Sequence, residues 1–387
     1  MDFALSDDQQ AIRDAIARLC EAYGDDYWLA RDRDGKFPDD FVKEIAAGGW
    51  LGIAMPKEVG GSGLGITEAA LMMQTIAESG GGFAAASSIH MNIFAPNPIA
   101  VHGTAKQKKR MLAPLIGGKE RACFGVTEPN AGLDTASIET RAERRGNAYV
   151  INGRKIWTST AQSASKILLL ARTAPKTKAK PTDGLSLFYT DLDRAHCEVR
   201  EIEKMGRKAV DSNAVFIDNL TVPADDLIGE EGQGFRYILH GLNPERILIA
   251  AEAVGLGRVA LARAARYAKE RIVFGRPIGQ NQGIQHPLAD AWARLEAANL
   301  MLFKAASLYD RGEPCGAEAN AAKYLAADAC HAACERAVLT LGGMGYAKEY
   351  HVERYLRECY IARIAPVSAE MILNFLAEKV LGLPKSY

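Results

Sequence analysis

The sequence predicts an α+β protein built from three successive parts. These are an N-terminal α-helical domain over residues 1–122, a middle β-barrel-like domain over 123–236 and a C-terminal α-helical bundle over 237–387. In the first and last parts, apolar residues recur at the three- and four-residue spacing of helices. In the middle part they form short runs bounded by turn residues, which is typical of strands. Because no clear linker separates the parts, we expect subdomains of one unit.

The composition is that of an ordinary globular protein. The chain has 387 residues, of which 48% are hydrophobic and 24% charged, so it is long enough for two or three domains. Lys+Arg and Asp+Glu both total 47, and this balance gives no reason to expect nucleic acid or a membrane surface as a partner. The N-terminus resembles no targeting peptide, and no run of 18 apolar residues predicts a membrane span. Seven scattered cysteines favour a cytoplasmic location.

The first part contains several signals for helix ends. Ser6-Asp7-Asp8-Gln9 predicts a capping box, and Gly24 is expected to stop the helix that follows. The glycine-rich stretch 60–65 could cradle a phosphate, but it lacks the Walker and Rossmann spacings, so a connecting turn is favoured. Further helices are predicted around 41–45, over 67–79, over 83–103 with a break, and from a second capping box at Thr104 to Gly117.

The middle part consists of short apolar runs. The predicted strands are 123–126, 149–159, 166–170, 185–189 and 214–217. Arg145-Gly146-Asn147 predicts a hairpin tip. The basic, proline-containing stretch 172–183 is expected to be an exposed loop, and contact with a substrate phosphate is the alternative.

The last part has the helical spacing of a bundle that packs on itself and on other subunits. The predicted helices are 245–272, 283–309, 317–341 and 367–381. Within the third, Cys330, His331 and Cys334 could suggest a metal site. Because no second ligand pair is present, buried structural cysteines are favoured and no metal site is predicted.

The stretch Cys123–Asp134, CFGVTEPNAGLD, is the centre of the functional prediction. Its strand breaks at Thr127-Glu128-Pro129, where backbone N–H groups and a hydroxyl are available to a ligand. The later strand ends in Trp157, Thr158 and Ser159. The two stretches could hold a flat, partly polar ligand between strands. From the residues alone, an ordinary hairpin with a core tryptophan is favoured.

Resemblance to a known family favours the ligand site over the ordinary hairpin. The TEPNAGLD turn and the NGRKIW strand resemble motifs of the flavin-binding β-domain of the acyl-CoA dehydrogenase family. The likeness continues, in the order of the family, over nearly the whole chain. It includes PKEVGGSGLG (56–65), ERIVFGRPIGQNQ (270–282) and LGGMGYAKEYHVERYLREC (341–359).

The resemblance implies an oxidoreductase that converts an acyl-CoA thioester to the trans-2-enoyl-CoA in fatty-acid β-oxidation. The α-hydrogen leaves as a proton and needs a carboxylate base. The β-hydrogen leaves as a hydride, which a flavin can accept and no side chain can. The resemblance also implies non-covalently bound FAD, transfer of electrons to an electron-transferring flavoprotein, and a homotetramer.

By the same resemblance, a set of residues scattered along the chain binds FAD. The set is Phe124, Val126, Thr127, Trp157, Ser159, Arg271, Phe274, Gln282, Gly342, Gly343, Ser368 and Glu370. Arg271, Phe274 and Gln282 match residues that reach the FAD of a neighbouring subunit. Individually each residue has a structural explanation, such as a surface ion pair for Arg271 or a helix stop for the glycines.

Two positions depart from the family pattern at the cofactor. Leu133, at a position expected to meet the cofactor or substrate pantetheine, replaces the usual serine. Leu339 replaces a usual glutamine near the adenosine half of FAD. Altered contacts are expected at both.

The largest departure concerns the catalytic base. Pro366 stands where many members place a catalytic glutamate, and proline offers neither a carboxylate nor an N–H. The segment Leu242–Ile247 resembles that of the isovaleryl- and long-chain acyl-CoA dehydrogenases, which carry the glutamate on a helix after the β-domain. Glu245 is therefore predicted as the base, with Arg246 and Asn243 binding substrate. Pro244 either kinks a continuous helix or opens a new one.

Two other functions compete with this prediction. A flavin-dependent monooxygenase or oxidase on the same fold could dispense with the glutamate at 366. A non-catalytic helical assembly protein could retain the scaffold without flavin. Ala365, where relatives often carry tyrosine, hints at space near the α-carbon of the substrate.

Overall fold

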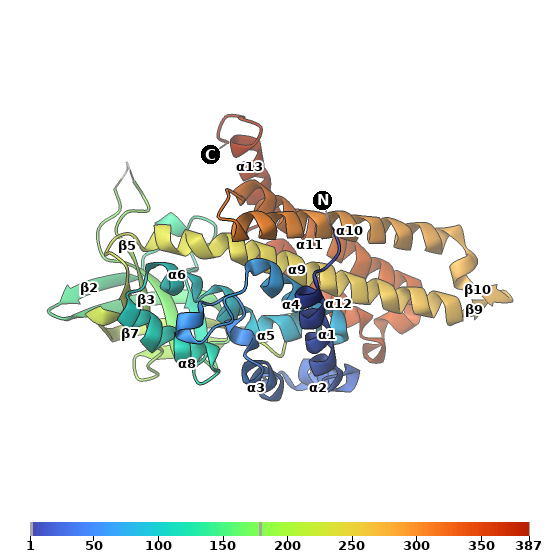
Figure 1. The fold of residues 1–387 in the computed structure, drawn as a ribbon, viewed down its shortest axis with the longest axis horizontal. Helices are drawn as coiled ribbons and strands as arrows, with labels where there is room; N and C mark the ends of the chain where they lie inside the picture. The colour runs from blue at the N-terminus through green and yellow to red at the C-terminus, as the bar shows by residue number, and fades with distance from the viewer. Residues whose placement is uncertain (1–2, 178–179, 387) are drawn as a thin grey trace.

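The computed structural model describes residues 3–177 and 180–386 and places a β-sheet at one end of an elongated helical body (Figure 1). The N-terminal helices are α1 (Asp7–Glu21), α2 (Asp25–Asp34), α3 (Asp39–Ala47), α4 (Ile66–Ile76), α5 (Gly82–Phe94), α6 (Asn97–His102), α7 (Ala105–Gln107) and α8 (Ala113–Ile116). Both predicted capping boxes are present, since Ser6 and Thr104 each accept the N–H of the residue three positions on.

Helix α2 was not predicted. Gly24, expected only to stop α1, is also the N-cap of α2, and Gly35 ends α2 in the left-handed conformation. The helix is short and mostly polar, so it lacks an apolar stripe that periodicity could detect. Its large buried side chain is Trp28, whose ring packs edge-on against that of Phe41 on α3, with 5.5 Å between the ring centroids.

One mixed sheet forms the middle of the chain. Its strands are β1 (Ala122–Gly125), β2 (Arg141–Arg145), β3 (Ala148–Ser159), β4 (Lys166–Arg172), β5 (Leu185–Asp191), β6 (Cys197–Glu201), β7 (Ser212–Pro223) and β8 (Leu227–Ile228). The order is β6-β7-β3-β2-β4-β5-β8, and β1 adds to β4 in parallel. The predicted hairpin tip is confirmed, because Arg145 pairs with Ala148 around Gly146.

The long strands β3 and β7 are interrupted by two register shifts. The second shift lies between Lys155 and Thr158, and within it Trp157 has a φ of 59°. A bulge of this kind redirects the side chain of the extra residue. Trp157 is 57% exposed, so the interpretation of it as a core tryptophan is wrong.

A buried ion pair fixes the turn after β1. The Lys155 ammonium lies 2.8 Å from the Glu128 carboxylate and also donates to the Val126 carbonyl at 3.1 Å. Glu128 accepts two further bonds, from the N–H groups of Glu139 and Thr140. Burial lowers the pKa of Lys155 to about 8, although Glu128 opposes this. Because these hydrogen bonds hold the Glu128 carboxylate in place, the preceding residue, Thr127, is also held at a fixed position beside the sheet.

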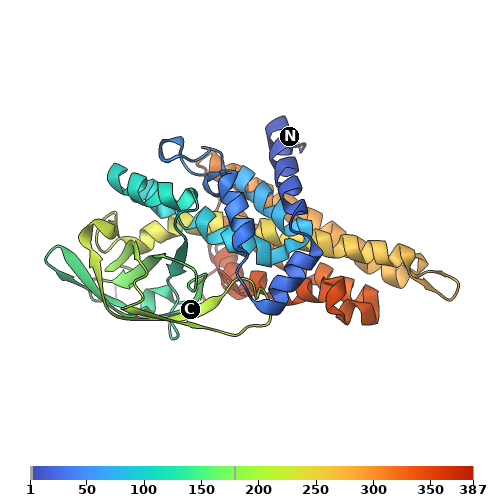
Figure 2. The ribbon, with the colours of Figure 1, turned by 90° about the horizontal axis from the view of Figure 1, so that it is seen from below.

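The C-terminal part contains five helices in the described chain: α9 (Gly234–Glu270), α10 (Gln282–Asp310), α11 (Gly316–Leu341), α12 (Val352–Ile364) and α13 (Ala369–Lys379). Between α9 and α10 a small hairpin, β9 (Ile272–Val273) and β10 (Arg276–Pro277), protrudes (Figures 1 and 2). Helix α9 starts well before the predicted 245 and continues through Pro244, so this proline lies within a continuous helix and does not open a new one. Helix α12 was missed because its buried residues alternate with many charges.

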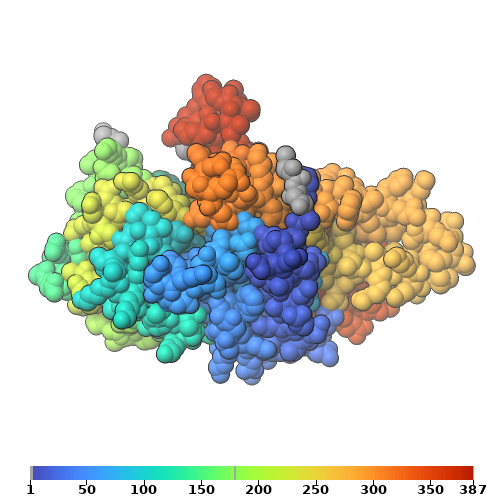
Figure 3. Space-filling model, viewed as in Figure 1, coloured from blue at the N-terminus to red at the C-terminus, as the bar shows by residue number. Residues whose placement is uncertain are grey.

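The C-terminal segment with helix α13 projects from the body (Figure 3), and it carries exposed apolar side chains. Leu373, Val380 and Leu381 are all exposed. By length and composition alone, the segment Val352–Lys379 is apolar enough to cross a membrane, with a mean hydropathy of 1.3 and 17% of the window buried. The structure divides this segment into α12 and α13, and α12 buries Tyr355 and Cys359 in the protein core.

The buried pair gives the first prediction. Lys155→Met removes the cation and leaves the Glu128 carboxylate buried, which should lower the free energy of unfolding by about 3–5 kcal/mol. Lys155→Met combined with Glu128→Leu removes both charges and should recover part of that loss. Urea unfolding measures both effects.

The matched control is Glu198→Gln, which breaks an exposed pair with Arg200 on β6. It should change the free energy of unfolding by less than about 0.5 kcal/mol. A loss in Lys155→Met no larger than in this control would show that the buried pair does not stabilise the turn.

Candidate active site

The structure brings the two central motifs together. The N–H of Ile156 donates to the Thr127 carbonyl at 2.9 Å, so the TEP turn lies directly beside the end of β3. Phe124, Val126, Thr127 and Ser159 are all partly buried there. Ser159 accepts a bond of 3.3 Å from the guanidinium of Arg207. The turn and the strand end that carries the indole are therefore neighbours, as a flat ligand held between them requires.

Glu245 lies on α9, about three turns after the helix begins at Gly234. Its Oε2 atom is shielded from solvent and has no hydrogen-bond partner among the described residues. Burial raises the pKa of Glu245 to about 7, although His90 and Arg246 oppose the shift. A carboxyl group of this kind can exchange a proton near neutral pH, which is what a general base needs.

The predicted substrate residues flank this carboxyl group. The Arg246 guanidinium donates to the Asn243 side-chain oxygen at 3.1 Å, and the Asn243 amide faces the Cys315 sulfur at 3.6 Å. The Nε of Arg246 is buried and unpartnered in the described chain. Arg246 therefore keeps donor capacity for an acceptor that the protein does not supply.

Glu252, on the same face of α9 as Glu245, forms a buried pair with His90 of α5. Glu252 follows Glu245 by seven residues, and seven residues are two helical turns. Its Oε1 lies 2.5 Å from Nδ1 of His90 on α5. Nε2 of His90 and Oε2 of Glu252 are both buried without a partner among the described residues. The His90 ring contacts Phe94, which in turn contacts Phe124 of β1, so aromatic contacts connect the pair to the sheet.

The link between α12 and α13 approaches the site from another side. Lys323 on α11 donates to the Val367 carbonyl at 2.6 Å, next to Pro366. Burial lowers the pKa of Lys323 to about 8, although Glu245 and Glu370 raise it. Ser368 caps α13, and Glu370 is exposed in its first turn. Residue 366 of this link is proline and supplies no carboxylate, so a base has to come from another element, such as Glu245 of α9.

The remaining predicted FAD residues lie elsewhere. Arg271, Phe274 and Gln282 belong to the β9–β10 hairpin and the start of α10, at the opposite end of the molecule from the sheet (Figures 1 and 2). All three are exposed, and Phe274 is fully so. Gly342 and Gly343 follow α11 and are also exposed. One chain therefore does not gather all the predicted residues around one ligand.

Several features fit a flavin dinucleotide. The half-exposed indole of Trp157 offers a flat face beside hydroxyl groups. A Cβ added to Gly342 or Gly343 would meet only open space, and Gly342 has a φ of 60°, so the backbone there is free for close approach by a ligand. Leu133 and Leu339, the two departures from the family pattern, are exposed.

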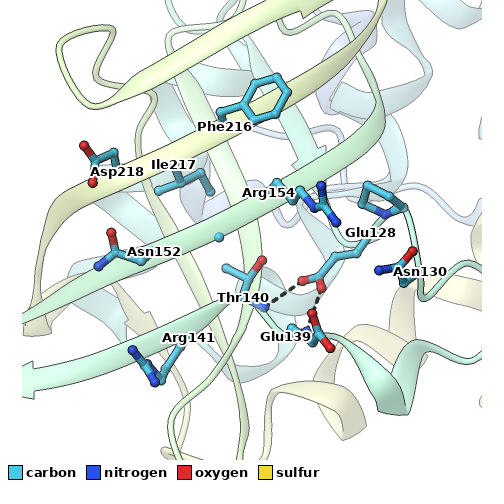
Figure 4. A pocket seen from close by; sticks show the side chains of 12 residues that line it. Glu128, Asn130, Glu139, Thr140, Arg141, Asn152, Arg154, Phe216, Ile217 and Asp218 are labelled. Carbon is cyan, nitrogen blue, oxygen red and sulfur yellow. Dashed lines mark hydrogen bonds between the residues drawn. The ribbon is translucent and has the colours of Figure 1, made fainter.

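A separate hollow of about 520 Å³ lies on the outer face of the sheet (Figure 4). It is lined by Asn130, Arg141, Arg154 and Asp218 among others, and the Glu128 bonds close its inner end. None of the predicted FAD or substrate residues lines it. It is therefore distinct from the surface around Trp157.

The predicted cysteine cluster is buried. All seven cysteines are free and buried, including Cys330 and Cys334 on α11. No group of three or more His, Cys, Asp or Glu side chains in residues 3–177 and 180–386 has a metal-binding arrangement.

Sequence reasoning missed His90, Glu252, Arg207 and Lys323. A signal existed for the first two, because Glu252 is the one polar residue in ILIAAEAVGLG and His90 is the one ionisable residue in SSIHMNIF. A buried ionisable residue needs a partner, so the two could have been paired. Nothing in the sequence indicated which turn of α5 faces α9.

Comparisons with known proteins agree with this geometry. Models of the acyl-CoA dehydrogenase N-terminal, middle and C-terminal domains match residues 6–119, 123–220 and 232–381. The acyl-CoA dehydrogenase FadE12 of Mycobacterium tuberculosis is 39% identical over 100% of this chain and 99% of its own. The caffeyl-CoA reductase-Etf complex subunit CarC of Acetobacterium woodii is 34% identical over 86% of this chain and 87% of its own.

Solved structures match over almost the full length. Butyryl-CoA dehydrogenase from Megasphaera elsdenii superposes with a TM-score of 0.93 at 30% identity, covering 98% of this chain and 100% of the other. The FAD complex of PigA superposes with a TM-score of 0.93 at 26% identity, covering 98% and 99%. The chain therefore belongs to the acyl-CoA dehydrogenase family of FAD-binding flavoproteins and is an oxidoreductase acting on CH–CH groups.

Proposed function

We propose that this protein catalyses the α,β-dehydrogenation of an acyl-CoA thioester to the trans-2-enoyl-CoA, with Glu245 as the base. The observation that carries the proposal is the buried, unpartnered Oε2 of Glu245, in a chain whose α12–α13 link has proline at 366. The pKa of about 7, caused by burial, supports this role, because a base that is too acidic would not accept a carbon-bound proton.

The other residues bind and orient. Thr127, Trp157 and Ser159 would hold FAD on the sheet side, and FAD supplies the acceptor for the β-hydride. The free Nε of Arg246 would bind an oxygen of the substrate, with Asn243 fixing the guanidinium. Lys323 holds the α12–α13 link in place through the Val367 carbonyl. The apolar packing around α5 and α9 excludes water from Glu245, which maintains its raised pKa.

We further propose that electrons leave to an electron-transferring flavoprotein and that the reaction belongs to β-oxidation of acyl groups. The name of the A. woodii relative, a subunit of a reductase-Etf complex, supports the first point. Seven free cysteines support a reducing, cytoplasmic location.

A homotetramer is the proposed assembly. Arg271, Phe274 and Gln282 lie at the end of the molecule away from Thr127 and Trp157, so they can contribute to a flavin site only in another subunit. The apolar surface of α13 would be covered in such an assembly. Dihedral symmetry would give each of the four copies the same contacts with its neighbours.

The first test of function is Glu245→Gln, which keeps the shape and removes the base. Anaerobic stopped-flow bleaching of the flavin by a panel of acyl-CoA thioesters should show reduction in the unsubstituted protein. Its rate constant should rise with pH, with a midpoint near the pKa of about 7, because only the carboxylate accepts a proton. Glu245→Gln should be slower by on the order of a hundredfold or more.

Glu198→Gln on the far edge of the sheet serves as the matched control and should reduce at the normal rate. Undiminished reduction in Glu245→Gln would exclude this residue as the base. Flavin that stays oxidised anaerobically in the unsubstituted protein with every thioester would instead favour the monooxygenase alternative.

The second test concerns the cofactor. FAD should be released into the filtrate when the protein is heat-denatured, because binding is non-covalent. Trp157→Ala removes the exposed indole and should weaken FAD binding by about tenfold, since ring stacking contributes about 1–3 kcal/mol. Trp292→Ala, at a similarly exposed tryptophan of α10, is the control. Yellow colour retained on the precipitate would contradict non-covalent binding.

The third test concerns assembly. Light scattering at micromolar concentration should give four times the chain mass of 41.8 kDa. Phe274→Ala should also lower the FAD content, although Phe274 is fully exposed in its own chain. A monomeric mass together with full FAD content would overturn the proposed assembly.

A further inference from the structure

The pair His90–Glu252 is not the sole anchor of α5. Apolar residues also hold this helix in the core, since Phe83, Ala86 and Ile89 of α5 are completely buried. A buried ion pair contributes little stability compared with apolar residues of the same volume. Its position on the same face of α9 as Glu245 suggests a different role.

The geometry leaves the pair half satisfied. One oxygen of Glu252 lies 2.5 Å from Nδ1 of His90, whereas Oε2 of Glu252 and Nε2 of His90 have no partner in the described chain. The carboxylate favours the protonated imidazole, which then carries an N–H on the buried Nε2. His90 is 7% exposed, so solvent cannot screen this charge effectively.

We propose that His90 and Glu252 form a positioning pair for Glu245, in which Glu252 keeps a positive charge on His90 along the face of α9 that carries the base and thereby sets the pH above which the base is ionised. This inference rests on the proposed function of Glu245. His90 does not itself accept the proton of the substrate. It acts by changing the pH at which Glu245, the group that accepts this proton, is ionised.

The electrostatics of the site agree with this assignment. The charges that act on Glu245 are those of His90 on α5, Arg246 and Glu252 on α9, and Lys323 on α11. The charges that act on His90 are those of Glu252, Glu245 and Arg207. Burial lowers the pKa of His90, but the charge and hydrogen bond of Glu252 outweigh it and the net direction is upward. Among the groups acting on Glu245, His90 makes the largest contribution that opposes burial.

The first measurement is the pH profile of flavin reduction. His90→Gln removes the cation and leaves the Glu252 carboxylate, so the midpoint should move upward by about one pH unit, with the rate at high pH retained. The double variant His90→Gln, Glu252→Gln also removes the unpaired carboxylate and should bring the midpoint back toward that of the unsubstituted protein.

His196→Gln is the matched control, because His196 is exposed and bonded to the Asp218 carbonyl on the sheet. It should leave the midpoint unchanged. A purely structural pair would instead lower the rate of His90→Gln at all pH values, without moving the midpoint and without recovery in the double variant. That result would overturn the proposal.

The second measurement does not depend on activity. Coupling between two titrating groups is reciprocal, so Glu245→Gln, which removes a negative charge near His90, should lower the titration midpoint of His90. NMR of histidine-labelled protein, with His90 assigned by its loss in His90→Gln, gives this midpoint. An unchanged midpoint would overturn the proposal.

The two measurements also separate the possible failures. Absence of flavin reduction in the unsubstituted protein, together with a shifted His90 midpoint in Glu245→Gln, would refute the proposed function and leave the charge coupling established. Normal flavin reduction with no coupling would refute only the positioning pair.

Discussion

The site depends on one physical constraint, the burial of carboxyl groups on an apolar helix. Helix α9 runs through the body of the molecule (Figure 1), and it places Glu245 and Glu252 on one face among buried apolar residues. Desolvation disfavours the charged forms. Among the described residues, Oε2 of both carboxyl groups has no partner, but Glu252 also binds the His90 imidazole through Oε1 at 2.5 Å. Burial raises the pKa of Glu245 to about 7, so Glu245 can exchange a proton near neutral pH.

On the other side of the site, the sheet has to meet two opposing requirements. A turn that exposes backbone and hydroxyl groups to a ligand must still be rigid. Glu128 achieves this by accepting bonds from Lys155, Glu139 and Thr140, which leaves Thr127 beside Ile156. The bulge in β3 then turns the Trp157 indole outward. Rigid polar bonding beneath the surface thus allows an open, aromatic surface above it.

The order of helical and strand segments and most element positions followed from periodicity and capping residues, because these signals are local. Helices α2 and α12 were not predicted, because charged residues interrupt their apolar stripes. At the site, Glu245 was predicted by resemblance and by the proline at 366, and its burial agrees with that role. His90 could not be placed opposite Glu252, since their contact joins residues 162 positions apart. The distance between Trp157 and Phe274 likewise emerges only from the tertiary structure.

The measurement that tests the central claim most directly is removal of the α-proton itself. An acyl-CoA analogue with sulfur in place of the β-carbon has no β-hydrogen to transfer, so proton exchange at the α-carbon can be followed alone, by mass spectrometry in D₂O. The account predicts deuterium incorporation by the unsubstituted protein and incorporation slower by on the order of a hundredfold in Glu245→Gln. Equal incorporation by both proteins would show that another group removes the α-proton and would contradict the account.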